Sequence, residues 1–379
     1  MIQDPVALMA FMFGLIAFSR WLERTVPAVQ QISSAVVCTL LGIALSNAGL
    51  MPHASPAYDG VNTYAIPYSI VLVILASDLR DLRRAGRSIV LCFLLAAVGS
   101  FAGGLVAGLL FADVLGPETW KLSGQFAGAF VGGGMNFVAV GRGLETEASI
   151  FAAASVADNL STVPWMLAQV GLFGLLARFY RAGDVTVDPE EAERESARIR
   201  DAWSHADLSV TEMAVLAGLP LLILWLSTQL APLLPGFPLV LWQTTLALIV
   251  AQLPIVRTLK GATVLSYFAL HLFFVVIGTS AVISELATSG LMLFAYMLTI
   301  IAVHALIVYT GGWLLRRDLA TITIASQAAV GGPGSALALS MSMKWPSLVT
   351  PGIIVGIFGY AIGNYIGFAC AYVTRALLG

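Results

Sequence analysis

Val131-Gly132-Gly133-Gly134-Met135-Asn136 interrupts a long apolar segment, and its pattern returns 199 residues later as Val330-Gly331-Gly332-Pro333-Gly334-Ser335. Glycine and proline weaken helices, and inside hydrocarbon the freed backbone amides and carbonyls must find partners in buried protein, in a solute or in an ion. Paired breaks at matching places in the two halves of a membrane chain indicate a binding site between repeats. The pattern therefore predicts a duplicated membrane protein whose two broken segments meet.

The composition supports a membrane protein with many spans. Apolar residues make up 59% of the 379-residue chain and charged residues 11%, and the mean hydropathy is +0.90. Soluble domains carry about 25% charged residues. A net charge of -2 without a basic face predicts no nucleic-acid partner. Cys38, Cys92 and Cys370 are far apart inside apolar runs, so we expect no disulfide framework, no metal cluster and no bound cofactor.

Apolar stretches near the length that crosses a bilayer occur six times in each half of the chain. They cover roughly 6–26, 32–51, 64–79, 88–112, 120–143 and 148–179, and then 209–234, 238–256, 264–284, 290–315, 319–343 and 348–374. The halves also align in their polar residues, since Asp81 to Gly86 falls opposite Glu285 to Gly290. We interpret residues 1–180 and 208–379 as two repeats, joined by a polar linker at 181–207.

The distribution of Lys and Arg decides whether the fifth segment of each half, 120–143 and 319–343, crosses the bilayer. If both are re-entrant hairpins, the chain crosses ten times, and all but Lys121, Arg142 and Arg375 of its 19 Lys and Arg residues lie in the cytoplasm. If both cross fully, most of these cations lie outside, against the positive-inside rule. The sequence therefore predicts ten transmembrane helices plus two re-entrant hairpins or discontinuous helices. It also predicts an outside N-terminus and a cytoplasmic linker, in a bacterial inner membrane.

Five crossings in each half would place the two repeats in opposite orientations. The first hairpin would then enter from the outside and the second from the cytoplasm, and their tips would meet near the middle of the bilayer. This is the geometry of secondary transporters with alternating access. Helix N-termini at such tips favour a carboxylate, and unwound carbonyls favour a cation.

Asp158 is the one carboxylate that falls deep inside an apolar segment. An ionisable residue there is costly and indicates a functional site. With Asn159, Ser155 and Thr162 on the same segment and Asn136 on the first hairpin, Asp158 forms a candidate oxygen-rich site for Na⁺. Two other interpretations stay open: Asp158 carries a proton as the coupling ion, or it is a structural residue capped by hairpin amides.

The solute is expected at the hairpin tips, where glycines expose the backbone. The candidate solute-binding residues are Gly132, Gly133, Gly134, Asn136, Gly331, Gly332, Gly334, Ser335 and Asn364. Asn136 and Ser335 occupy equivalent positions, and each could instead hydrogen-bond the freed backbone. Asn364 belongs to the part of the last segment that corresponds to Asp158, so an acid occurs in only one repeat. His304, in the middle of its segment, is interpreted as a packed, hydrogen-bonded residue rather than a proton relay.

Three stretches carry a resemblance to a known family: Val131 to Ala139, Ala157-Asp158-Asn159, and Ile66-Pro67 through Ser77-Asp78-Leu79-Arg80. Across essentially the whole chain they resemble the bacterial integral membrane family named domain of unknown function 819. Inverted repeats with paired broken segments are more distantly similar to the superfamily of sodium/proton antiporters and of sodium symporters for bile acids, citrate and glutamate. That similarity implies a core domain that carries the broken segments and moves against a scaffold, often at a dimer interface.

These observations predict a secondary active transporter and not an enzyme. It would couple Na⁺ or H⁺ to symport of a small organic solute that bears a carboxylate, by an elevator-type mechanism and as a homodimer in the lipid bilayer. A sodium/proton antiporter that uses Asp158 is the first alternative, and a non-transporting membrane sensor or scaffold is a more remote one. An intramembrane hydrolase is disfavoured, because Asp158 has no facing acid and His304 has no serine partner defined by a motif.

Overall fold

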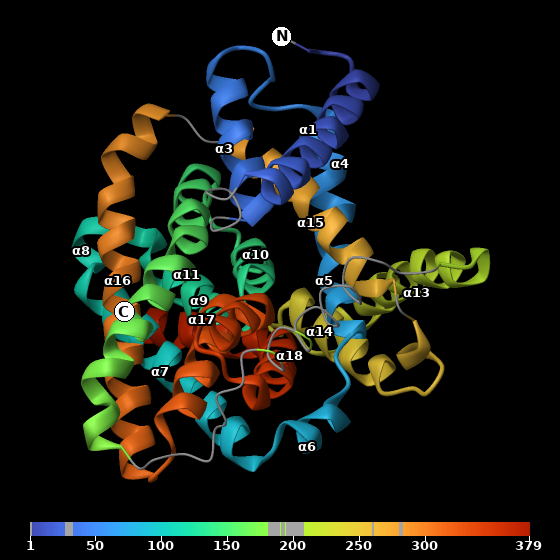
Figure 1. Ribbon diagram of the computed structural model, residues 1–379. Helices are drawn as coiled ribbons and strands as arrows, with labels where there is room; N and C mark the ends of the chain where they lie inside the picture. Colours follow the sequence, from blue (N-terminus) through green and yellow to red (C-terminus); the bar gives the residue numbers. More distant parts are fainter. Residues whose placement is uncertain are drawn as a thin grey trace.

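The computed structural model of the chain is built from helices and describes residues 2–26, 33–180, 190, 194, 208–259, 261–279 and 283–379 (Figure 1). The description leaves out the side chains of Ser33, Ala35, Val36, Asn159, Leu160, Val163 and 283–289. No strand occurs in the described ranges, which confirms the expected all-α fold. Of the linker expected at 181–207, only Glu190 and Arg194 are inside these ranges.

The main helices follow the apolar segments of the sequence. In chain order they are α1 (Pro5–Thr25), α3 (Ser33–Asn47), α5 (Ile66–Leu75), α7 (Arg87–Leu110), α9 (Thr119–Gly132), α10 (Gly134–Gly143), α11 (Ala148–Leu176), α13 (Val210–Leu230), α14 (Leu239–Ala251), α15 (Ala262–Thr279), α16 (Ile283–Leu314), α17 (Leu319–Ser342) and α18 (Pro346–Leu378). Three short helices connect them: α4 (Pro56–Gly60), α6 (Leu82–Ala85) and α8 (Ala112–Leu115). A π-helical turn, Val61–Ala65, joins α4 to α5.

Local sequence fixes where several of these helices begin. The Asp4 carboxylate accepts a hydrogen bond from the Ala7 amide at 2.8 Å, and Pro5 follows it at a position where no intrahelical donor is needed. At the start of α17, Asp318 accepts from the Thr321 amide at 2.7 Å. These caps satisfy amides that a helix end leaves unpaired.

Six helices in the described ranges are long and apolar enough to cross a bilayer. They are Pro5–Thr25, Arg87–Leu110, Val210–Leu233, Ala262–Thr279, Gly290–Leu314 and Pro346–Leu378. The bent pair Pro56–Leu75 and Leu79–Ala85 gives a seventh if it forms one span. The chain is therefore a multi-pass membrane protein, and the ten crossings expected from the charge bias stay a prediction.

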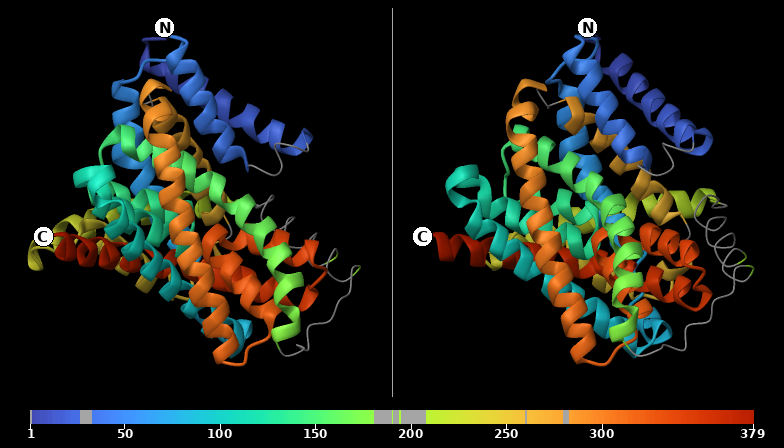
Figure 2. Two further views of the ribbon diagram at one scale, coloured as in Figure 1. Left: turned by 90° about the vertical axis from the view of Figure 1, so that its left-hand side faces the viewer. Right: turned by 60° about the vertical axis from the view of Figure 1, so that its left-hand side comes forward.

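The helices pack in two groups. In the first group, α15 packs against α3 and α5, α14 packs against α5 and α13, and α1 packs against α3 and α15. In the second, α18 packs against α9, α17 and α7, while α16 packs against α7 and α11. Figure 2 shows α1 and α3, in blue, at one end of the molecule and away from α18, in red. We call these the α15 group and the α18 group.

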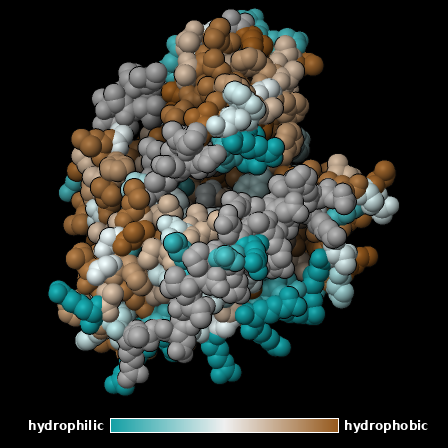
Figure 3. Space-filling view, in the orientation of Figure 1, coloured by the Kyte–Doolittle hydropathy of each residue, from teal (hydrophilic) through white to brown (hydrophobic). Residues whose placement is uncertain are grey.

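Apolar side chains cover much of the outside as well as the core. In Figure 3 hydrophobic residues lie over the top and the sides of the visible face, and hydrophilic residues gather along its lower edge. On α13, for example, Val210 is 89% exposed and Trp225 is 57% exposed. Apolar side chains of this size on an outer helix face suit contact with lipid tails.

Candidate functional site

The first glycine stretch forms a helical hairpin. Gly133, between α9 and α10, has φ +79° and ψ -174°, a region that favours glycine. The two arms lie against each other, because a Cβ atom on Gly141 would overlap the side chain of Gln125. At the open end Lys121 Nζ donates to the carbonyl of Glu145 at 2.9 Å. The chain therefore turns back at Gly133 instead of continuing as one rod.

The second glycine stretch breaks α17 in the same way. Gly332 has φ +74° and ψ -173°, nearly the conformation of Gly133. The Ser335 hydroxyl donates to the carbonyls of Gly332 at 2.9 Å and of Gln327 at 3.1 Å. Residues eight apart in a straight helix would be separated by about 12 Å along the axis. This contact between Ser335 and Gln327 shows that α17 also folds back at its glycine.

The two hairpin tips pack side by side on α18. The carbonyl of Val131, in the first tip, occupies the place of a side chain at Gly359. A Cβ atom on Gly356 would lie 2.7 Å from the nitrogen of Pro333, in the second tip. These two glycines are about one helical turn apart. Small residues on α18 thus let both backbones approach closely, as expected for helices that pack in a membrane.

Tyr360 lies between the two breaks. A Cβ atom on Gly133 would be 3.8 Å from its ring, and one on Gly332 would be 3.7 Å from its hydroxyl. The same hydroxyl lies 3.4 Å from that of Tyr267, on α15 of the other helix group. Tyr360 was not among the residues expected from the sequence, although a hydroxyl-bearing aromatic residue inside the glycine-rich part of the last helix is a visible signal.

Asp158 lies next to Gly134 of the first tip. It is 7% exposed, and its Oδ2 atom would be 3.8 Å from a Cβ atom on Gly134, the first residue of α10. In the described part of the chain, no side chain or amide forms an ion pair or hydrogen bond with this carboxylate. The start of α10 instead presents the positive end of a helix dipole. One turn along α11, Thr162 packs against Gly331 of the second tip.

The remaining candidates for the ion site differ in what they contact. Ser155 is buried on the same helix as Asp158, and the side chain of Asn159 is outside the described residues. Asn136 turns toward α18, where its Nδ2 atom donates to the carbonyl of Tyr360 at 3.1 Å and to Oδ1 of Asn364 at 2.8 Å. The amide of Asn364 donates in turn to Thr244 of α14 at 2.8 Å. The hairpin is thereby joined to both helix groups.

Asn136 keeps one unused polar atom in this arrangement. Its Oδ1 atom is buried and has no hydrogen-bond partner among the described residues, while Gly132 packs directly against it. A buried acceptor without a partner costs free energy, so a ligand or cation that reached it would be bound more tightly. Ser335, the equivalent residue, instead hydrogen-bonds the backbone of its own hairpin.

A cavity of about 550 Å³ opens beside the second tip. Its lining includes Thr263, Tyr267, Pro333, Ile357 and Tyr360, and five charged residues that we call the mouth: Asp78, Arg80, Asp81, Arg84 and Arg257. Of the predicted site, the cavity thus touches the second tip at Pro333. Asp158 is not one of the lining residues; it lies near Gly134 of the first tip instead.

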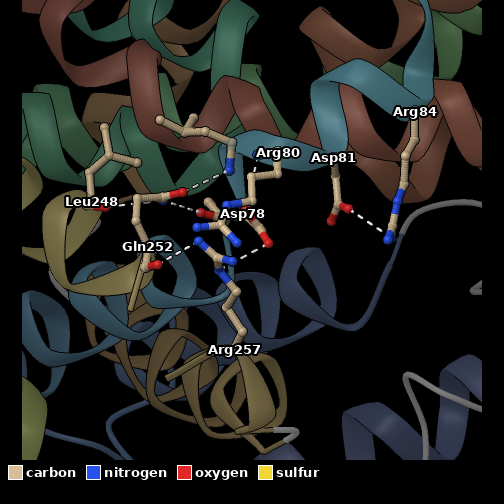
Figure 4. A network of polar contacts seen from close by, with 9 residues as sticks. Asp78, Arg80, Asp81, Arg84, Leu248, Gln252 and Arg257 are labelled. Atoms are coloured by element: carbon tan, nitrogen blue, oxygen red, sulfur yellow. Dashed lines mark hydrogen bonds and ion pairs between the residues drawn. The ribbon is translucent and has the colours of Figure 1, made fainter. Parts of the chain in front are cut away.

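A polar network surrounds the mouth of this cavity (Figure 4). Asp78 forms an ion pair with Arg257, with 3.1 Å between Oδ2 and Nε, and Gln252 donates to the carbonyl of Leu248 at 3.1 Å. Asp81 pairs with Arg84 at 3.0 Å. These charges come from the turn after α5 and the turn after α14, so only the folded chain brings them together.

Two comparisons with known proteins bear on this site. The model of the family described as "Protein of unknown function (DUF819)" matches residues 10–377. The "Uncharacterized membrane protein YjcL" of Bacillus subtilis (strain 168) is 28% identical over 381 residues, which cover 96% of each chain. The match confirms the family resemblance drawn from the sequence, and it includes both hairpins, Asp158 and the charged mouth.

Proposed function

The chain belongs to the family described as "Protein of unknown function (DUF819)", and from this premise we propose that it is a secondary active transporter. In this proposal Na⁺ or H⁺ drives the symport of a small organic solute. We place it in the wider superfamily of sodium/proton antiporters and of sodium symporters for bile acids, citrate and glutamate. The protein moves solutes across the bilayer and is not an enzyme.

The observation that carries the proposal is the meeting of two equivalent helix breaks beside a buried acid. Gly133 and Gly332 share one backbone conformation, and Tyr360 contacts both. Asp158, on α11, lies beside the first residue of α10 and forms no ion pair in the described part of the chain. Such a carboxylate is costly in apolar surroundings, and the cost falls when a cation binds. Broken helices next to it supply the opposite partial charges that a solute and an ion need.

The mechanism proposed is a movement of the α18 group against the α15 group. The α18 group carries both hairpins and Asp158, and the cavity lies where Tyr360 of this group faces Tyr267 of the other. Its volume falls within the roughly 300–1,000 Å³ typical of small-molecule sites. Sliding of one group would carry ion and solute together, as in an elevator.

The experiment that tests the proposal uses the purified protein. A panel of small metabolites is screened for thermal stabilisation in Na⁺ and in choline, because a ligand that binds the native state raises its melting temperature. We expect a solute that stabilises the protein in Na⁺ only and that accumulates in proteoliposomes along a Na⁺ gradient. Binding without accumulation would point to a sensor, and accumulation independent of Na⁺ and H⁺ gradients would remove the coupling.

A sodium/proton antiporter is favoured by one specific observation. Asp158 does not line the cavity and has no polar side-chain partner in the described residues, so it could bind Na⁺ and H⁺ in turn without a solute. Proton flux is therefore measured in vesicles with a Na⁺ gradient and no added solute. Exchange of Na⁺ for H⁺ under these conditions would show that the protein is an antiporter rather than a symporter.

Orientation and assembly belong to the same proposal. We place the protein in a bacterial inner membrane as a homodimer, with the N-terminus outside. Turns assigned to one side by the charge bias do contact each other: Asp78 pairs with Arg257, and Arg142 donates to the carbonyl of Asn62 at 3.4 Å. Labelling of cysteines introduced at Arg83 and at Arg142 in intact cells tests the assignment, since only the second should react from outside.

A further inference from the structure

The cavity mouth holds one positive charge that no acid in the described part of the chain neutralises. Asp78 pairs with Arg257 at 3.1 Å and Asp81 pairs with Arg84 at 3.0 Å, so these four charges cancel locally. Arg80 also lines the cavity, and its guanidinium forms no ion pair or hydrogen bond with any residue that the structure describes. The mouth therefore carries a net positive charge that is concentrated at Arg80.

The backbone around Arg80 is held in place. Asp78 Oδ1 accepts a hydrogen bond from the Arg80 amide at 2.9 Å, which starts the 3₁₀ turn Leu79–Asp81. Gln252, at the end of α14, accepts from the Leu79 amide at 3.2 Å and donates to the carbonyl of Ser77 at 3.1 Å. The turn is thus fixed to α14, and Arg80 stands at a defined place on the cavity wall (Figure 4).

We propose that the cavity admits small organic anions and that Arg80 is the residue that recruits them. The proposal rests on the proposed function and names the class of its solute. A guanidinium binds carboxylate or phosphate oxygens through paired hydrogen bonds, and a cleft of one charge concentrates ions of the opposite charge. The hydroxyls of Thr263, Tyr267 and Tyr360 also line the cavity and offer further polar partners.

The charge preference of the cavity can be measured without knowing the solute. Thr263 lines the cavity and is partly exposed, and Thr263→Cys places a thiol there without adding bulk. The three natural cysteines are buried, so background reaction is low. The rates at which Cys at this position reacts with a negatively charged and a positively charged methanethiosulfonate reagent are measured. The rates of the free thiol glutathione with the same two reagents are the reference.

We expect the ratio of the anionic to the cationic rate to exceed that of glutathione, and to fall severalfold in Thr263→Cys/Arg80→Gln. Added salt should lower it as well, because the charge is near the surface. Arg83→Gln is the matched control: Arg83 is exposed, is three residues away and does not line the cavity. Equal ratios in the Arg80 and Arg83 variants, or faster reaction with the cationic reagent, would overturn the proposal.

A transport assay distinguishes a failure of this inference from a failure of the proposed function. Proteoliposomes are offered monocarboxylates, dicarboxylates, inorganic phosphate and the uncharged amides of the same acids. We expect uptake of an anion, with a KM raised about tenfold or more by Arg80→Gln and less by Arg80→Lys. Uptake of an amide that Arg80→Gln leaves unchanged would refute the anion preference and keep the transporter. If nothing in any charge class is transported, the proposed function fails, and the labelling ratio still decides the charge preference.

Discussion

The Nε2 atom of His304 lies 2.8 Å from the hydroxyl of Ser326, which joins α16 to the first arm of the second hairpin. On its other side, Nδ1 of His304 is 2.9 Å from the Ser100 hydroxyl, and Ser100 donates to the carbonyl of Phe130 at 2.6 Å. Since the Ser100 hydroxyl donates its proton to a backbone carbonyl, of Phe130 at 2.6 Å or of Ala96 at 3.1 Å, we infer that Nδ1 of His304 donates to Ser100. His304 thus links the two hairpins, in keeping with the packed, hydrogen-bonded histidine expected from the sequence.

We expect His304→Ala to lower the free energy of unfolding by about 1–3 kcal/mol, because the substitution removes the hydrogen-bond partner of the buried Ser326 hydroxyl and one of the partners of Ser100. The measurement is chemical or thermal unfolding in detergent. A double-mutant cycle with Ser326→Ala isolates the hydrogen bond. Strictly additive effects of the two substitutions would mean that the bond contributes nothing.

Asp158→Asn should leave the protein folded and remove its response to Na⁺. The change replaces a buried carboxylate that has no ion pair in the described residues, so stability without Na⁺ is expected to stay equal or to rise. The melting temperature is recorded in Na⁺ and in choline. Asp113→Asn, an exposed carboxylate, is the control and should keep the wild-type difference between the two cations. Na⁺ stabilisation that survives in Asp158→Asn would exclude Asp158 as the ion ligand.

Alanine substitutions of two glycines in the first hairpin and one on α1 should lower the free energy of unfolding by different amounts. Gly132→Ala should be severe, because the new Cβ atom would overlap the Asn136 amide and lie 2.5 Å from the carbonyl of Gly359. Gly133→Ala has space, with 3.8 Å to Tyr360, and should cost about 1–3 kcal/mol through its glycine-type backbone conformation alone. Gly14→Ala, in open space on α1, should be neutral or stabilising. Melting temperatures of the three variants test this order, and a Gly133→Ala protein as unstable as Gly132→Ala would contradict it.

The cap of α11 predicts a dependence on pH. Glu147 accepts hydrogen bonds from the Ser149 amide at 3.0 Å and the Ile150 amide at 3.1 Å. Partial burial raises the pKa of Glu147, but these bonds and one from the Ser149 hydroxyl outweigh it and hold the pKa below its ordinary value. Because the folded pKa is the lower one, this stabilisation is present above the ordinary value of about 4.3 and is lost as the pH falls through the folded pKa.

The melting temperature of the wild type should therefore fall more steeply with acidification than that of Glu147→Gln. Glu145→Gln, two residues away and not a cap, serves as the control and should follow the wild type. Parallel curves for the wild type and Glu147→Gln would show that the cap does not contribute.

The helix breaks could be predicted from the sequence because their cause is local. Gly133 and Gly332 sit in glycine-rich stretches with a fixed offset, and positive φ is what glycine allows. Asp158 could be found as well, since an isolated acid in an apolar run is visible without coordinates. The number of crossings could not be fixed, because helices such as α14 are short for a bilayer span and neighbouring helices decide their tilt.

The cavity could not be predicted, because its wall depends on how distant segments pack. Asp78 lies at the end of an apolar segment, where a carboxylate needs no special explanation, yet the fold pairs it with Arg257 from the other half of the chain. Arg80 is one of several similar arginines in the sequence, and the fold distinguishes it by placing it on the cavity wall without a counterion in the described structure. Tyr360 acquires its place from two glycines that lie in separate halves of the chain.

The hydrogen bond from Asn364 to Thr244 runs from one helix group to the other, and Thr245 and Tyr365 form a second such bond at 2.7 Å. All four partners are neutral, so separating them exposes no bare charge, and water can replace each bond at a net cost of about 1 kcal/mol. These contacts between the two helix groups are therefore weak and can break and re-form at little cost in free energy. In the proposed elevator movement, weak bonds of this kind would hold the α18 group in one position and keep the barrier to the next position low.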